Sequence, residues 1–224
     1  MSDAAMADMR QLRDAALAGQ REAQLLLAQA SMEGRGLQAD HDEAFHWYSV
    51  SANLGEPMAM NMLGRCHELG QGTPVDMGLA AVWYRKAAEA GLDWGMYNFA
   101  HLLASGNGIT QDRAAAYRWY LRAARHGHAR AMNFVGRFHE NGWEVECDST
   151  QAMIWYRRAA HAGDFRGQAN LASMLADRGQ LDEALQWLQR APDIGTPSFV
   201  DRLRQELAAS PHVRLRELAG AIPA

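Results

Sequence analysis

A tryptophan recurs every 36 residues through most of this 224-residue chain, and this period constrains the fold more than any other feature. A tyrosine follows each tryptophan directly, and a glycine follows it at the eighth position. The copies are Trp47-Tyr48 with Gly55, Trp83-Tyr84 with Gly91, Trp119-Tyr120 with Gly127, and Trp155-Tyr156 with Gly163. A fixed period of this length is typical of repeat proteins, whose units bury their apolar faces against neighbouring units. We therefore expect a stack of repeats rather than a domain built around one deep pocket.

Two helices fit between successive glycines of this series. The segment after each glycine, such as 58–64, carries its apolar residues at helical spacing, and no alternating strand pattern competes with it. An aspartate then precedes the Trp-Tyr segment, where it can accept hydrogen bonds from the first N–H groups of a second helix. These aspartates are Asp40, Asp76, Asp112 and Asp148. The closing glycine can adopt the left-handed conformation that ends a helix. The sequence therefore predicts an all-α fold.

The detailed motif resembles that of a known family. In one copy it reads Leu63-Gly64, then Gly70-Gln71-Gly72, then Trp83-Tyr84-Arg85-Lys86-Ala87-Ala88-Glu89-Ala90-Gly91. Over about residues 20 to 191 the chain is similar to the SEL-one-like repeat family, a relative of the tetratricopeptide repeat. The resemblance implies an α/α right-handed superhelix, a solenoid of 36-residue helix-turn-helix repeats. It also implies an adaptor without catalytic activity and without a cofactor.

The period also divides the chain into three predicted regions. Residues 1–19 form an N-terminal capping helix with Gln11 at the tryptophan position, and residues 20–195 form five repeats. Residues 196–224 form C-terminal capping helices, at about 197–208 and 211–219. Thr196-Pro197 and Ser210-Pro211 each place a capping residue before a proline, which favours a helix start.

Composition narrows the partners and the compartment. The formal net charge of −4 gives no electrostatic case for binding nucleic acid. We expect no membrane insertion, since no run of about 18 apolar residues occurs. Two distant cysteines and an acidic start without a signal-peptide pattern favour a cytoplasmic location. Lys86 is the only lysine, which we interpret as the codon bias of a GC-rich bacterium.

Neither catalysis nor metal binding is predicted. The Gly-x-Gly turns lack the strand and third glycine of a dinucleotide site. His67-Glu68 and His139-Glu140 lie two repeats apart, too far to share one ion if packed helices are roughly 10 Å apart. The repeated aromatic pairs are interpreted as core, rather than as a stack for a sugar or base, because every copy has the same placement.

A binding surface is predicted where the repeats differ. By the resemblance, the first helix of each pair lines a concave groove, and its inward positions vary between repeats while the Trp-Tyr scaffold does not. The predicted site residues are Asn61, Arg65, Trp94, Tyr97, His101, Arg130, Asn133, Arg137 and Arg166. Arginine can bind a carboxylate with two hydrogen bonds, and asparagine can bind peptide backbone. Trp and Tyr are enriched at interface hot spots. We expect a protein or peptide partner whose extended segment carries a carboxylate.

Other interpretations of the same residues stay open at this point. The groove residues can instead form a solvated polar face, with Arg137 paired to Glu140 three positions later. The chain can also be a regulatory partner subunit of an enzyme, using its convex face or C-terminal helices. An apolar stripe at Phe199, Val200, Leu203 and Leu207 would serve that purpose, or it would be buried as a cap. A hydrolase would need a convergent acid–base pair, which we do not find in the sequence. The oligomeric state and the identity of the partner do not follow from the sequence.

Overall fold

The computed structural model describes residues 3–34, 38–194 and 196–221, and within these it contains thirteen helices and no strand. The predicted all-α class is therefore confirmed. The ends of the two predicted caps, residues 1–2 and 222–224, lie outside the described residues, as do residues 35–37 and 195. The chain divides into two compact units, Met1–Trp119 and Tyr120–Ala224. Each unit is described by itself.

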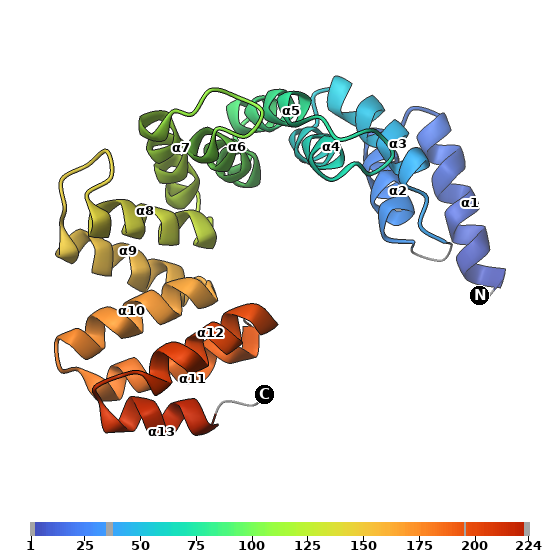
Figure 1. The fold of residues 1–224 in the computed structure, drawn as a ribbon. Helices are drawn as coiled ribbons and strands as arrows, with labels where there is room; N and C mark the ends of the chain where they lie inside the picture. Colours follow the sequence, from blue (N-terminus) through green and yellow to red (C-terminus); the bar gives the residue numbers. More distant parts are fainter. Residues whose placement is uncertain (1–2, 35–37, 195, 222–224) are drawn as a thin grey trace. The chain divides into compact units, whose positions relative to one another are not determined.

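Consecutive helices pack on each other within each unit (Figure 1). Unit 1 contains α1 (Asp3–Leu17), α2 (Arg21–Glu33), α3 (His41–Asn53), α4 (Pro57–Leu69), α5 (Met77–Glu89) and α6 (Asp93–Ser105). The unit boundary falls inside α7 (Arg113–Arg125). Unit 2 continues with α8 (Ala129–Asn141), α9 (Ser149–His161), α10 (Phe165–Asp177), α11 (Leu181–Ile194), α12 (Pro197–Ala208) and α13 (Val213–Ala221). In addition, α4 contacts α6 and α8 contacts α10, so the first helices of neighbouring repeats are adjacent.

The helix ends are formed by the residues that the repeat predicts. The side chains of Asp40, Asp76, Asp112 and Asp148 accept hydrogen bonds from backbone N–H groups two or three residues later, at 2.8–3.0 Å. The glycines that close the second helices have φ between +87° and +96°, a range that other residues rarely adopt. Both expectations are confirmed.

The tyrosine of each Trp-Tyr pair, rather than the tryptophan, is the innermost residue. Tyr48, Tyr84, Tyr120 and Tyr156 are at most 1% exposed. Trp155 is 8% exposed, and Trp83 and Trp119 are only partly buried. The tyrosine ring lies against a helix that has no side chain at the point of contact: a Cβ on Gly136 would lie 2.6 Å from the ring of Tyr156. The glycine and tyrosine together set how closely α8 and α9 approach.

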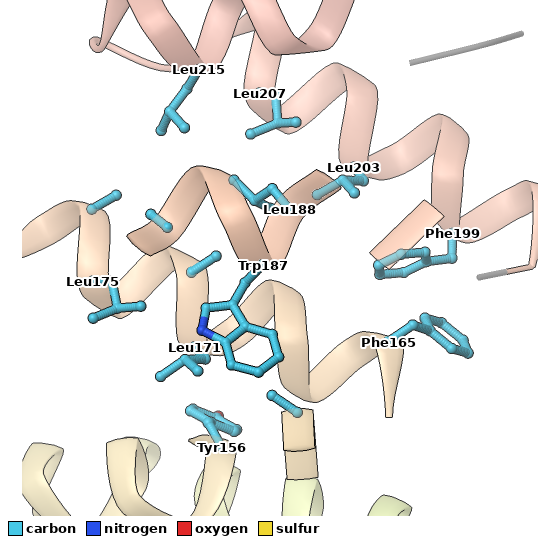
Figure 2. Close-up of a cluster of buried hydrophobic side chains, with 14 of the residues drawn as sticks. Tyr156, Phe165, Leu171, Leu175, Trp187, Leu188, Phe199, Leu203, Leu207 and Leu215 are labelled. Carbon is cyan, nitrogen blue, oxygen red and sulfur yellow. The ribbon is translucent and has the colours of Figure 1, made fainter. Parts of the chain in front are cut away.

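The apolar stripe of the C-terminal helices is buried. Phe199, Leu203 and Leu207 of α12 pack with Trp187 and Leu188 of α11 and with Leu215 of α13 (Figure 2). The ring of Phe199 also meets that of Phe165, at the start of α10, at a centroid distance of 4.5 Å. Phe199, Leu203 and Leu207 therefore belong to the core of unit 2, with Val200 partly buried beside them, rather than to an exposed apolar interface. This packing also fixes the polar face of α12 beside α10.

The close approach of α8 and α9 gives a stability prediction. Gly136→Ala should lower the free energy of unfolding by about 1–3 kcal/mol, because the new methyl group meets the buried ring of Tyr156. Gly220→Ala is the matched control, since a Cβ at this helical glycine would meet nothing within 4 Å. The control should be neutral or stabilising by up to about 1 kcal/mol. Urea denaturation of both variants measures the difference, and equal losses would contradict the packing described here.

Candidate peptide-binding site

The predicted site residues fall into two sets that belong to different units. In unit 1, α4 carries Asn61 and Arg65, and α6 carries Trp94, Tyr97 and His101. In unit 2, α8 carries Arg130, Asn133 and Arg137, and α10 carries Arg166.

In unit 1 the three aromatic residues of α6 form a row of rings. The indole of Trp94, which is 42% exposed, meets Tyr97 edge to face at 6.5 Å. The ring of Tyr97 is in turn stacked on His101 at 6.4 Å, with an angle of 11° between the ring planes. Arg65 is an exposed residue of the neighbouring α4. The row offers an amphipathic surface of the kind found at protein interfaces.

The two asparagines of the predicted site have a structural contact that the sequence analysis missed. The side-chain N–H of Asn98 donates to Asn61 Oδ1 at 2.9 Å, and that of Asn170 donates to Asn133 Oδ1 at 2.8 Å. Asn61 and Asn133 are 5% and 3% exposed. These hydrogen bonds link α4 to α6 and α8 to α10. Each contributes about 1 kcal/mol to the stability of the fold. These two acceptors are thus used within the fold rather than held ready for a peptide backbone.

In unit 2 three of the predicted residues meet in one pocket. The pocket has a volume of about 320 Å³ and lies between α8, α10 and α12. Its lining consists of Asn133, Arg137, Arg166, Ala169, Asn170, Phe199, Arg202 and Glu206. We call it the arginine pocket. Arg130 does not line it; the charge of Arg130 acts on Asp164, whose pKa is raised by burial in spite of the nearby cations.

Among the described residues, Arg137 and Glu140 do not form the ion pair that the polar-face interpretation requires. Glu140 instead accepts a hydrogen bond from the hydroxyl of Tyr156 at 2.6 Å. Burial, and then this hydrogen bond, raise the pKa of the Tyr156 hydroxyl well above its usual value. The guanidinium of Arg137 lies 5.5 Å from the ring centre of Phe134 and 5.4 Å from that of Trp143. In the described part of the chain, no carboxylate lies within ion-pair distance of Arg137.

The positive charges of the other two arginines of the pocket are also weakly neutralised by ion pairs. Arg166 stacks over the ring of Phe165 at 4.4 Å, and among the described residues it has no ion-pair partner. Arg202 pairs with Glu206 at 3.6 Å, but both side chains are about two-thirds exposed. Such exposed pairs contribute little, typically below about 1 kcal/mol. The pocket is therefore lined by three arginines and by one carboxylate, that of Glu206, which is in a weak ion pair. This lining makes the pocket suitable for an anionic group.

The residues that α12 brings to this pocket, and Asn170 of α10, are not among the predicted groove residues. Phe199, Arg202 and Glu206 belong to a helix outside the 36-residue period, so the period does not predict which repeat they face. Asn170 carried a detectable signal. Asn98 and Asn170 have the same spacing, 72 residues, as Asn61 and Asn133, which indicates a feature shared by every second repeat.

The histidine and cysteine side chains of the described residues do not form a comparable cluster. The described residues contain no group of three or more potential metal ligands. Burial raises the pKa of the Cys66 thiol to about 11, so this cysteine stays protonated and is a weak nucleophile near neutral pH. Cys147 is exposed, and its thiol donates to the carbonyl of Glu140 at 3.2 Å. No helix in the described ranges has the length and apolar character needed to cross a bilayer.

The imidazole of His67 is buried in unit 1, in the position that Leu103 and Leu175 occupy in other repeats. Its ring meets Phe45 edge to face at 5.5 Å, and its Nδ1 has no hydrogen-bond partner among the described residues. Burial lowers the pKa of His67, although the charge of Asp76 opposes this effect. The folded state therefore favours the neutral imidazole.

Comparison with known proteins places the repeats in one family model. The model described as the Sel1 repeat matches residues 21–56, 57–92, 95–128, 129–164 and 166–191. The comparison with curated proteins finds no match.

Several solved structures share this fold. A Sel1 repeat protein from Oxalobacter formigenes is 28% identical, with a TM-score of 0.76 over 91% of this chain and 88% of that protein. A protective antigen of uropathogenic Escherichia coli with an SLR fold, c5321, is 22% identical, with a TM-score of 0.77 over 95% of this chain. The alignment covers 48% of c5321, so the chain spans about half the length of that protein. The immunity protein PA5088 from Pseudomonas aeruginosa is 19% identical, with a TM-score of 0.59 over 91% of this chain and 80% of that protein. The last two likenesses concern the fold alone.

The buried His67 gives a prediction for acid stability. Below about pH 6.5 the unfolded chain takes up a proton at His67, whereas burial disfavours this protonation in the folded chain. The contribution of the neutral His67 to the free energy of unfolding is therefore fully present above that pH and is lost as the pH decreases. His67→Leu should reduce the loss of unfolding free energy between pH 7.5 and pH 5.5, measured by urea denaturation. The exposed His126 provides the control, because His126→Leu should leave the loss unchanged. The same slope in all three proteins would refute the assignment.

Proposed function

Because the chain belongs to the Sel1 repeat family, whose members generally mediate protein–protein interaction, we propose that it is a non-catalytic adaptor. Its ligand in this proposal is an extended segment of a partner protein that carries a carboxylate. The carboxylate binds in the arginine pocket of unit 2.

The observation that carries the proposal is the position of Arg137 in a pocket with two further arginines. A guanidinium that lines a concave surface without a carboxylate partner can form two parallel hydrogen bonds with an incoming carboxylate. Arg166 and Arg202 add positive charge at the same point. Each charge is partly screened by solvent, so we expect micromolar rather than nanomolar affinity for a short segment, equivalent to about 8 kcal/mol of binding free energy.

The proposal also gives unit 1 a part in binding. Two helices of this unit carry residues that the sequence predicts for binding: Arg65 on α4, and the row of Trp94, Tyr97 and His101 on α6. Exposed tryptophan and tyrosine side chains bury a large area at a small cost in side-chain entropy. In this proposal they are a separate contact surface for a protein partner.

A depression lined mainly by residues of α9 supports a second candidate, in which the chain is a regulatory partner subunit. Met132, Met153 and Ile154 line a shallow, largely apolar depression of about 630 Å³ there. Ile154 is 39% exposed, and Arg158 borders the same depression. This surface is the alternative location for a partner, and the experiment below distinguishes it from the arginine pocket.

A short acidic peptide provides the direct test. The peptide acetyl-Ala-Ser-Asp-Ala-Ser-Ala-amide should bind at least about tenfold more tightly than its counterpart with Asn in place of Asp, measured by calorimetry at low salt. Arg137→Glu should abolish this preference, because it puts a negative charge beside the incoming carboxylate. Raising the salt concentration should weaken binding of the acidic peptide to the unchanged protein.

Arg85→Glu is the matched control. Arg85 is an exposed arginine of α5 that pairs with Glu89 four residues later, and it does not line the arginine pocket. This variant should keep the preference for the acidic peptide, and both variants should keep the helical circular dichroism spectrum. Unchanged peptide binding by Arg137→Glu would contradict the proposal. For a natural partner, binding that survives Arg137→Glu but is lost in Ile154→Asp would place the interface at the apolar depression over α9.

A further inference from the structure

A second pocket of unit 2 adjoins the arginine pocket. This second pocket has a volume of about 400 Å³ and is lined by residues of α10, α11, α12 and the start of α13. Ala169, Asn170 and Glu206 line both pockets, so the two are neighbours along α10, and we refer to them together as the groove. We call the second one the distal pocket. A ligand with its carboxylate among the arginines therefore extends naturally into the distal pocket.

The sign of the charge changes along this groove. Arg166, Ser173 and Asp177 lie on one face of α10, since their spacings of seven and four residues are close to whole helical turns. Arg166 lines the arginine pocket and Asp177 lines the distal pocket. Eleven residues separate them, which corresponds to about 16 Å along the helix axis. The groove is positive at one end and negative at the other.

The nearby cations do not neutralise Asp177. Among the described residues, no basic group lies within ion-pair distance of its carboxylate. The adjacent Arg178 donates to the sulfur of Met153 at 3.1 Å. Arg216 donates to the backbone carbonyls of Ser210 and Pro211, at 2.8 and 2.9 Å. Both guanidinium groups are thus held by other contacts.

Glu206 lies between the positive and the negative end of the groove. It lines both pockets, and its ion pair with Arg202 is long and exposed, so it remains a source of negative potential in the middle of the groove. A ligand with several consecutive acidic residues would place a like charge beside Glu206 or Asp177. Such like-charge contacts are unfavourable, so the groove discriminates against a fully acidic segment.

The shape of the distal pocket restricts the residues between the charged ends. Its lining includes the small side chains Ala169, Ala172, Ser173 and Ala176 of α10, together with Leu203 and Leu207 of α12. A pocket of about 400 Å³ with this partly apolar lining favours small uncharged side chains. An extended peptide advances about 3.3 Å per residue, so 16 Å corresponds to about five residues.

We propose that the groove binds a bipolar segment, with an acidic residue among the three arginines and a lysine or arginine about five residues away, beside Asp177. Small uncharged residues lie between the two charges. This inference rests on the proposed function, because it takes the arginine pocket as the carboxylate site and adds the identity of the other end of the ligand.

Three peptides that differ at one position test the inference. They share the sequence acetyl-Asp-Ala-Ser-Ala-Ala and end in Lys-amide, Gln-amide or Asp-amide. With the unchanged protein at low salt, calorimetry should give at least fivefold tighter binding for the Lys peptide than for the Gln peptide. The Asp peptide should bind more weakly than the Gln peptide. Asp177→Lys should reverse this order, so that the Asp peptide binds most tightly.

Glu146→Lys is the control variant, since it makes the same charge change at an exposed loop position of unit 2 outside both pockets. It should keep the order of the unchanged protein. Equal binding of the three peptides, or tightest binding of the Asp peptide to the unchanged protein, would overturn the bipolar inference while leaving the carboxylate site intact. If none of the three binds, the carboxylate site itself is wrong, and the inference falls with it.

Discussion

The contact between a buried tyrosine and the preceding helix determines both the packing and the chemistry of each unit. In unit 2 the ring of Tyr156 fits against Gly136, and its hydroxyl donates to Glu140. A hydrogen bond to a charged carboxylate contributes about 1.5–3 kcal/mol when partly buried, whereas an exposed Arg–Glu pair on one helix contributes about 0.3–0.5 kcal/mol. Glu140 therefore has the hydroxyl of Tyr156 as its partner, and we infer that this contact leaves Arg137 available to the pocket that it lines. In this account, the contact between Tyr156 and Glu140, which stabilises the fold, also leaves the positive charge of Arg137 available for binding.

Unit 1 contains the same arrangement. Tyr84 lies against Gly64 and donates to Glu68 at 2.5 Å, and Arg65 occupies the position of Arg137. The asparagine pairs repeat in the same way, and the shared spacing of 72 residues shows that the polar contacts alternate from one repeat to the next. The structural period of the apolar core is thus 36 residues, while that of the polar face is twice as long. Repeats of one type supply the arginine and glutamate, and the following repeats supply the second asparagine.

The 36-residue period predicts the helices and their caps well, because these depend on contacts within one repeat. The aspartate caps and the closing glycines are local features that one copy of the motif already specifies. The depth of burial within a Trp-Tyr pair is not local: it depends on the missing side chain at Gly136, on another helix. The predicted role of Asn133 changed for the same reason, because its partner Asn170 comes from the next repeat. Arg202 could not be placed from the period, since α12 lies outside it and docks through Phe199 and Leu203.

Two single-atom substitutions show whether Tyr156 keeps Glu140 from pairing with Arg137. Tyr156→Phe removes the hydroxyl that holds Glu140, whereas Tyr84→Phe removes the equivalent hydroxyl in unit 1. Calorimetric affinity for one aspartate-containing peptide should fall about two- to fivefold in Tyr156→Phe, because the released carboxylate competes for Arg137. The affinity should stay unchanged in Tyr84→Phe. Wild-type affinity in Tyr156→Phe, or the same loss in both variants, would contradict the account.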